Sequence, residues 1–130
     1  MKVLTIREPF ATLIKNNIKY IETRSWKTNY RGEIHIHSSV SKLSKEVKER
    51  KELSKLYRED ELQYGYILCK CNLKDCVLMT KEFIEQEKKN NHNNFVSGRY
   101  EEGRYAWILS DVEIIKPIKA KGQLGIWNYK

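Results

Sequence analysis

Apolar and polar positions predict a strand and then a short helix at the start of the chain. Residues 2–6, KVLTI, form a β-branched apolar run that is typical of a buried strand. The segment from about 8 to 16 carries Pro9 near its beginning and apolar residues at i, i+3 and i+4 spacing, which predicts a helix with one buried face. Asn16 and Asn17 are expected to end this helix, because asparagine tolerates the left-handed backbone that follows many helices.

Two more strands and a longer helix follow in the pattern. Strands are expected at 18–24 and 33–39, with the polar turn SWKTNYRG between them and Gly32 closing that turn. Residues 41–57 show the clearest helical pattern, since their leucine, valine and tyrosine side chains fall on one side and the charges elsewhere. Charged pairs at i,i+4 spacing stabilise such a helix by only about 0.2–0.5 kcal/mol each. We therefore interpret 41–57 as a solvent-exposed amphipathic helix and not as a binding arm.

The second half of the chain is predicted to consist mostly of strands. A long strand at 64–79 is expected to bend near Asn72, and a short helix with Thr80 at its N-cap follows it. The polar segment 90–103 is long enough to form a mobile loop or a lid. Further strand patterns are YAWIL, VEIIKPI and the terminal stretch after the turn at Gly122 and Gly125.

These elements together predict an α+β fold. Strands outnumber helices, and several strands must pair across long sequence distances. The simplest architecture is a small mixed β-barrel with two or three helices packed outside it. A chain of 130 residues has the size of one ordinary domain, so a single domain is expected over 1–130.

The composition is that of a globular protein. Apolar residues make up 40% of the chain and charged residues 32%. No apolar run approaches the ~20 residues that a membrane span needs. The first residues, MKVLTIREPF, lack the apolar run and cleavage site of a secretion leader. We expect a cytoplasmic protein that uses no membrane and no cofactor, and the sequence leaves the oligomeric state open.

Cysteine and histidine pairs raise the question of a metal site. Cys69, Cys71 and Cys76 are odd in number, which argues against a disulfide framework. The first two share a strand face, but the usual C-x-x-C spacing and a fourth ligand are missing, so buried free thiols are expected. His35 and His37 also share a strand face without a third ligand, and a solvated or hydrogen-bonded face is the favoured interpretation. No metal site is predicted.

The net charge of +8 is concentrated at the two chain ends. Residues 1–32 carry a surplus of five positive charges and residues 112–130 a surplus of three, whereas residues 33–111 hold 14 of each sign. If the fold brings the ends together, they form one positive patch, which favours a polyanion such as nucleic acid. Charge alone also suits a basic protein that binds nothing specific.

The stretch 16–32, NNIKYIETRSWKTNYRG, combines cations and aromatic rings around one acid. It holds four cations, one carboxylate and three rings, namely Lys19, Arg24, Lys27 and Arg31, then Glu22, then Tyr20, Trp26 and Tyr30. Lys19 can complement the end of the preceding helix, bind phosphate, or act as a base if it is desolvated. Glu22 and Arg24 share a strand face and can form an ion pair that orients the guanidinium. The rings can be core anchors or stacking platforms, but the combination favours a recognition site.

At this stretch the chain resembles the ASCH domain family, which has a PUA-like β-barrel fold. NIKYIETR matches the family signature G-x-K-x-x-E-x-R, except that Asn17 replaces glycine. The resemblance continues in the same order through LTIREPFATLI, RSWKTNYRGEIHIHSS, YGYILCKCNLKDCV and YAWILSDVEIIKPIKAKGQLGIW, so it covers most of the chain. It implies a cleft beside the first helix, into which Lys19, Glu22 and Arg24 project.

The resemblance also implies two functional directions. Members of the family are associated with nucleic-acid binding, some within transcription coactivator or RNA-modifying assemblies. Another branch hydrolyses the acetyl amide of acetylated cytidine with a lysine, a threonine three residues later and a more distant glutamate. Here the threonine position is Glu22, although Thr23 and Ser25 lie next to it, and Asp75 is an approximate match for the distant acid.

The leading hypothesis is therefore a domain that binds nucleic acid in a basic cleft and prefers RNA to DNA. A nucleotide-like ligand in the same cleft is included in this hypothesis. Eight residues are the predicted contacts: Lys19, Glu22, Arg24, Ser25, Trp26, Lys27, Tyr30 and Arg31. The alternative is a small amidohydrolase of modified pyrimidine nucleosides, in which Lys19, Glu22 and Asp75 act and Glu22 activates water. A third possibility is an interaction module with a vestigial cleft.

Overall fold

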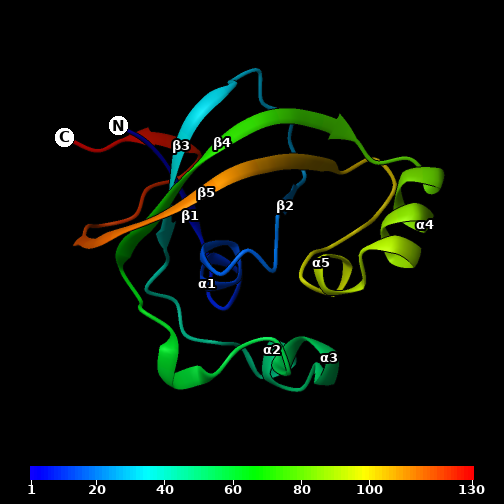
Figure 1. Cartoon of the computed structure of the whole chain (residues 1–130), viewed down its shortest axis with the longest axis horizontal. Helices are drawn as coiled ribbons and strands as arrows, with labels where there is room; N and C mark the ends of the chain where they lie inside the picture. The colour runs from blue at the N-terminus through cyan, green and yellow to red at the C-terminus, as the bar shows by residue number, and fades with distance from the viewer.

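All six strands belong to one strongly curved sheet in the computed structural model, which describes residues 1–130 (Figure 1). The strands are β1 (Lys2–Ile6), β2 (Ile21–Arg24), β3 (Gly32–Ser38), β4 (Tyr66–Leu78), β5 (Tyr105–Lys119) and β6 (Ile126–Asn128). Their order is β2-β5-β4-β3-β1-β6, and only β1 and β3 pair in parallel. The sheet curls into a half-barrel, which confirms the predicted α+β class.

Five short α-helices surround the sheet, rather than the predicted two or three. They are α1 (Phe10–Lys15), α2 (Lys45–Lys48), α3 (Lys51–Ser54), α4 (Lys81–Asn90) and α5 (His92–Val96), and a 3₁₀ turn, η1, spans Glu59–Glu61. Thr80 caps α4 as predicted, since its hydroxyl accepts a hydrogen bond from the backbone N–H of Phe83 at 3.1 Å. None of these helices has the length and apolar character that a membrane crossing requires.

The prediction of one continuous helix over 41–57 is wrong, because the helix is interrupted between α2 and α3. Arg50, at the break, has an extended backbone with φ −78° and ψ 100°. The apolar residues still gather as the pattern predicted, with Leu53 and Tyr57 packing on Leu13 of α1. A helix this short gains most of its stability from packing. The break preserves that packing and lets the guanidinium of Arg50 donate to the carbonyl of Val96 at 2.7 Å.

The predicted strand at 18–24 begins later, at Ile21. The backbone N–H groups of Ile18 and Lys19 both donate to the carbonyl of Leu13, at 2.9 and 3.1 Å, and so close the end of α1. Asn17 takes the left-handed conformation expected of a helix stop, with φ 61°. Lys19 therefore lies in the tight connection between α1 and β2, where its backbone position is fixed by the helix end.

The long strands β4 and β5 form the largest pairing in the sheet and both bend across it. Their register shifts at three points, one of them between Lys70 and Asn72, in agreement with the bend predicted near Asn72. Bulges of this kind increase the local twist and let a sheet curl. Helix α1 lies inside the curl of the sheet (Figure 1). The main core is there, and Ile14 of α1 shares it with Ile36 and Trp107 of the strands.

The two histidines of β3 are both buried, so of the two predicted forms, a solvated or a hydrogen-bonded face, the second is confirmed for His37. His37 is hydrogen-bonded, with Nε2 2.7 Å from the carbonyl of Ala120 and Nδ1 3.2 Å from the hydroxyl of Thr5. His35 packs on the opposite face from Ile34 and Ile36, and its Nδ1 has no hydrogen-bond partner. Both ring nitrogens of His37 are used within the fold, which leaves it no free atom for a metal.

All three cysteines are free thiols, and two of them are expected to resist alkylation. Burial raises the pKa of Cys69 and of Cys71 to about 12. Only a thiolate reacts quickly with iodoacetamide. At pH 8 the folded protein should therefore label at Cys76 alone, which is half-buried, and all three thiols should label in denaturant. Mass spectrometry of the intact protein checks this, and rapid labelling of two or more thiols in the folded state would contradict the burial.

Candidate functional site

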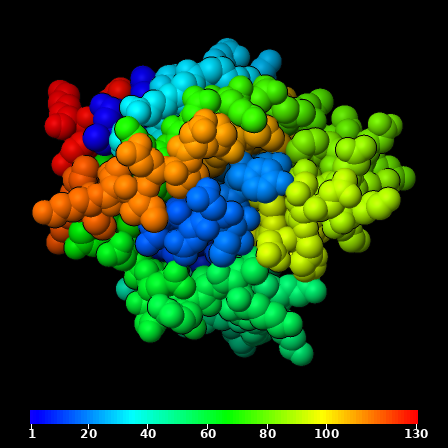
Figure 2. Space-filling model, viewed as in Figure 1, coloured from blue at the N-terminus to red at the C-terminus, as the bar shows by residue number.

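A pocket of about 690 Å³ lies beside α1 and is here called the main pocket. Its 17 lining residues come from four parts of the chain, within 5–10, 19–26, 46–50 and 97–104. These are the β1–α1 connection, β2 with its flanks, the α2–α3 segment and the segment from α5 to β5. Figure 2 shows α1 in blue, the α2–α3 segment in green and α5 in yellow meeting on one face of the molecule. Residues far apart in sequence therefore build one site.

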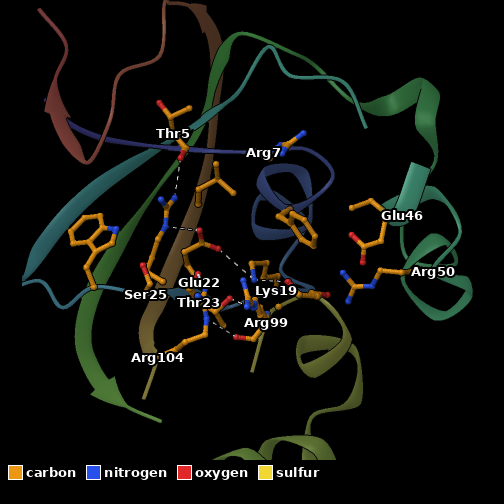
Figure 3. Close-up of a pocket in the computed structure, with 17 residues that line it drawn as sticks. Thr5, Arg7, Lys19, Glu22, Thr23, Ser25, Glu46, Arg50, Arg99 and Arg104 are labelled. Carbon is orange, nitrogen blue, oxygen red and sulfur yellow. Dashed lines mark hydrogen bonds and ion pairs between the residues drawn. The ribbon is translucent and has the colours of Figure 1, made fainter. Parts of the chain in front are cut away.

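Lys19, Glu22 and Arg24 form a continuous charged chain in this pocket (Figure 3). The Nζ of Lys19 lies 3.5 Å from Oε1 of Glu22 and donates to the carbonyl of Ser97 at 2.6 Å. Oε2 of Glu22 accepts from Nε of Arg24 at 2.9 Å. Both oxygens of the buried Glu22 carboxylate are thus held by cations, and Glu22 fixes the positions of Lys19 and Arg24.

Burial makes Lys19 an unusual lysine. Its side chain is 1% exposed, and desolvation lowers its pKa, with Glu22 partly opposing this shift and Arg24 and Arg50 adding to it. A buried ion pair is costly to build, and removal of one partner leaves an uncompensated charge that typically costs about 3–5 kcal/mol. Burying the Lys19–Glu22 pair therefore costs stability, and buried charged pairs of this kind are typical of functional sites.

Arg24 is held in place but keeps free donors. Its Nη2 donates to the carbonyl of Thr5 at 3.0 Å, and its guanidinium carbon lies 6.0 Å from the ring centroid of Trp107. Its Nη1 makes no hydrogen bond within the protein, and the side chain is 22% exposed. A guanidinium fixed at one edge and open at another is prepared to bind an anion such as a phosphate oxygen.

More cations than acids line the main pocket. Six lysine and arginine residues line it against two glutamates: Arg7, Lys19, Arg24, Arg50, Arg99 and Arg104, with Glu22 and Glu46. Arg104 donates to the carbonyls of Thr23 and Arg99, both at 3.3 Å, and Figure 3 shows Arg50 pointing from the α2–α3 segment toward Lys19. Half of the positive charge around the pocket therefore comes from the middle of the chain.

This placement changes the charge argument made from the sequence. The chain ends do meet, because β1 pairs with β6 and the N-terminal amine donates to the carbonyl of Tyr129 at 3.0 Å. None of the C-terminal lysines lines the main pocket, whereas three arginines of the segment with balanced charge do. Counting charges along the sequence could not find Arg50, Arg99 and Arg104, because only the fold brings them to β2.

One wall of the pocket is built by α5 and the residues after it, in the segment predicted to be a loop or a lid. Asn94 is buried and uses all of its amide: its Oδ1 accepts from the N–H groups of Tyr20 and Ile21, at 2.9 and 3.2 Å, and its Nδ2 donates to Glu87 and Tyr100. This network anchors the wall on the start of β2. Nothing in the polar run NNHNN distinguishes Asn94 from its neighbours, so sequence reasoning missed it.

Gly98 lets this wall approach β2 closely. A Cβ atom at this position would lie 2.9 Å from the ring of Tyr100 and 3.0 Å from the methyl group of Thr23. The next residue continues the contact, because the N–H of Arg99 donates to the hydroxyl of Thr23 at 3.0 Å. The wall therefore has little freedom to move as a lid.

The structure divides the residues predicted for the site into two groups. Five line the main pocket: Lys19, Glu22, Arg24, Ser25 and Trp26. Four do not: Lys27, Tyr30, Arg31 and Asp75. Tyr30 packs against the core and donates its hydroxyl to the carbonyl of Glu33 at 2.6 Å, and Arg31 pairs with Asp75 at 3.5 Å.

Asp75 lies on the opposite face of the sheet from Glu22. Glu22 pairs with Trp107 on β5, and Trp107 pairs with Cys76 on β4, so these three residues follow one row across the sheet. Asp75 precedes Cys76, and adjacent residues of a strand point to opposite faces. The lysine, acid and second acid of the amidohydrolase hypothesis are therefore not brought together.

An aromatic edge borders the charged chain. Trp26 is 39% exposed, and its ring meets the ring of Trp107 edge to face, with centroids 4.7 Å apart. Its carbonyl accepts from the indole N–H of Trp107 at 3.2 Å. The Trp26 ring is thus held at the rim with surface left for stacking.

No group of three His, Cys, Asp or Glu side chains is placed to hold a metal ion.

Comparisons with known proteins identify the family of the chain. The chain is 34% identical over 90 residues to human activating signal cointegrator 1, a match that covers 64% of this chain and 15% of that protein. The fold is similar to the crystal structure of a mutant of ZmASCH from Zymomonas mobilis, with a TM-score of 0.53 and 14% identity over 91% of this chain and 74% of that one. The ASCH domain profile matches residues 4–119. The chain belongs to the ASCH domain family.

Proposed function

We propose that this protein binds single-stranded nucleic acid, RNA in preference to DNA, in the main pocket. The observation that supports the proposal most strongly is that six cations and only two acids line one concave site, which has an exposed tryptophan at its rim. Phosphate contacts from lysine and arginine supply most of the affinity in such complexes, and aromatic rings stack on bases. The association of the ASCH family with nucleic acids supports the same proposal.

Each part of the pocket has a proposed role. Arg24 binds a phosphate, because it lines the main pocket with Nη1 free while its other two nitrogens are held. Glu22 orients Arg24 and Lys19 rather than contacting a base, since both of its oxygens are occupied. Trp26 stacks on a base, and Arg104 and Arg99 extend the positive wall.

The shape of the pocket favours an unpaired strand. A cavity of about 690 Å³ lies within the range of small-ligand sites, about 300–1,000 Å³. A base can enter it only when it is not stacked and paired in a duplex, which is the state that proteins recognise in RNA loops and ends. The 2′-hydroxyl gives RNA an additional donor and acceptor for the polar lining.

Tryptophan fluorescence tests the proposal. Trp26 is 39% exposed at the pocket, whereas Trp107 and Trp127 are buried. Titration with a short single-stranded RNA should quench the emission of Trp26, and the quenching should vanish in Trp26→Phe. The matching DNA should bind more weakly. An unchanged emission together with no binding in a label-based assay would remove the proposal and leave an interaction module with an unused cleft.

One observation favours a second candidate, an amidohydrolase of modified pyrimidine nucleosides. Lys19 is buried with a pKa that desolvation lowers, and it lies 3.5 Å from the Glu22 carboxylate, and a lysine and a carboxylate are both residue types that act in general acid–base catalysis. Turnover of an acylated cytidine, lost in Glu22→Gln while circular dichroism shows a preserved fold, would establish it. No turnover across a panel of acylated nucleosides would remove it.

A further inference from the structure

A second, smaller hollow adjoins the main pocket between α3 and α5, and is here called the side pocket. Its volume is about 330 Å³. It is lined by Arg50, Lys51, Glu52, Leu53, Phe95, Val96 and Gly98. Arg50 and Gly98 also line the main pocket, so the two cavities share a border. A ligand longer than one unit can therefore extend from one cavity into the other.

Arg50 stands at this border with its guanidinium partly committed. Its Nη2 donates to the carbonyl of Val96 at 2.7 Å, which ties the break between α2 and α3 to the end of α5. Its other nitrogens make no hydrogen bond within the protein. Arg50 is fixed by one nitrogen and lines both cavities. It can therefore bind a phosphate that links a ligand group in one cavity to a ligand group in the other.

The side pocket has the chemistry of a nucleotide site on a smaller scale. Phe95 supplies an aromatic ring, which is itself supported by Tyr100 with centroids 5.0 Å apart. Lys51 adds an exposed positive charge. The acid of this pocket, Glu52, lies beside His92, whose Nε2 is 3.2 Å from its Oε2. Two cations, Arg50 and Lys51, outnumber this one acid, so the net charge of the lining favours an anionic ligand.

We propose that the side pocket binds the nucleotide adjacent to the one in the main pocket, with the linking phosphate at Arg50. This inference rests on the proposed function of the main pocket. The base of the second nucleotide contacts Phe95, and Lys51 contacts its outer phosphate. The preferred ligand is then at least two consecutive nucleotides, and a mononucleotide fills only the main pocket.

A comparison of ligand lengths tests this. Uridine monophosphate and the dinucleotide pUpU compete with a labelled oligonucleotide for the wild-type protein and for Lys51→Ala, Phe95→Leu and Lys55→Ala. Lys55 is an exposed lysine at the end of α3 that lines neither pocket, so it controls for loss of charge. We expect pUpU to bind about tenfold more tightly than the monophosphate, since one stacked base is worth about 1–3 kcal/mol. Lys51→Ala and Phe95→Leu should each reduce this advantage and leave monophosphate binding unchanged.

The outcomes separate the two proposals. If the monophosphate binds and pUpU binds no more tightly, the side pocket is not a subsite and the main pocket keeps its proposed function. If Lys55→Ala reduces the advantage as much as Lys51→Ala, or if neither Lys51→Ala nor Phe95→Leu reduces it, the side pocket is again excluded. If neither ligand nor any oligonucleotide binds, both proposals fail.

Discussion

Replacing Arg24 with methionine is expected to weaken binding of single-stranded RNA by about 10-fold to 100-fold, because a hydrogen bond to a charged group contributes about 1.5–3 kcal/mol. Methionine keeps an apolar chain beside Trp107 but removes the guanidinium that Glu22 and the Thr5 carbonyl hold in place. Glu22 retains Lys19 as its partner, so the carboxylate is not left alone. The loss should be one of affinity more than of folding.

Salt dependence separates a phosphate contact from a change in shape. Loss of one phosphate contact lowers the slope of log K against log salt by about 0.7 for a single strand. Arg31→Met is the matched control, since Arg31 carries the same charge in the same segment and lies outside the main pocket. It should change neither affinity nor slope appreciably. Equal effects of the two substitutions would mean that total charge, and not the pocket, binds the ligand.

Replacing Asn94 with alanine is expected to lower the free energy of unfolding by about 2–4 kcal/mol, because the Asn94 amide makes four hydrogen bonds inside the fold. Its amide accepts from the N–H groups of Tyr20 and Ile21 and donates to Glu87 and Tyr100. Alanine leaves the backbone N–H groups of Tyr20 and Ile21 without this acceptor and Tyr100 without this donor, and the Ile21 N–H is buried. The wall that carries the Ser97 carbonyl would then lose its anchor, so Lys19 would lose a defined partner.

Urea unfolding followed by circular dichroism measures this effect. Asn93→Ala is the control, because Asn93 is exposed in the same helix and only its backbone carbonyl is used, as the acceptor from the Ser97 hydroxyl at 2.5 Å. Its unfolding midpoint should stay close to that of the wild type. If both alanine variants lose the same stability, the cause is the helix and not the amide network of Asn94.

Local patterns predicted the elements that form the base of the site. The Asn17 helix stop, the Thr80 cap and the strand at 33–39 depend on neighbouring residues, and all three are present in the fold. Local reasoning also predicted that Glu22 and Arg24 share a strand face, and the two side chains pair at 2.9 Å. It did not predict that Lys19 lies beside Glu22, because a strand over 18–24 would point these two side chains to opposite faces. That expectation came from the resemblance to the ASCH signature, and the later start of β2, at Ile21, explains why the two side chains can meet.

The remainder of the pocket depends on contacts between distant segments. Arg50 reaches the site only because the predicted helix over 41–57 breaks, and that break is stabilised by the carbonyl of Val96. Asn94 serves as an anchor only because α5 packs beside the start of β2. Lys27 and Arg31 are close to the signature in sequence, but the turn directs them away from the pocket. Sequence proximity was therefore a poor guide to the second half of the site.

Photocrosslinking can show whether nucleic acid is bound in the main pocket. An oligouridylate that carries 4-thiouridine is irradiated with the protein, and the crosslinked peptides are identified by mass spectrometry. We expect crosslinks within residues 5–10, 19–26 or 97–104, which line the pocket, and their loss in Arg24→Met. Crosslinks confined to the lysine-rich residues 116–130, which line neither pocket, or no crosslinks at all, would contradict binding in the main pocket.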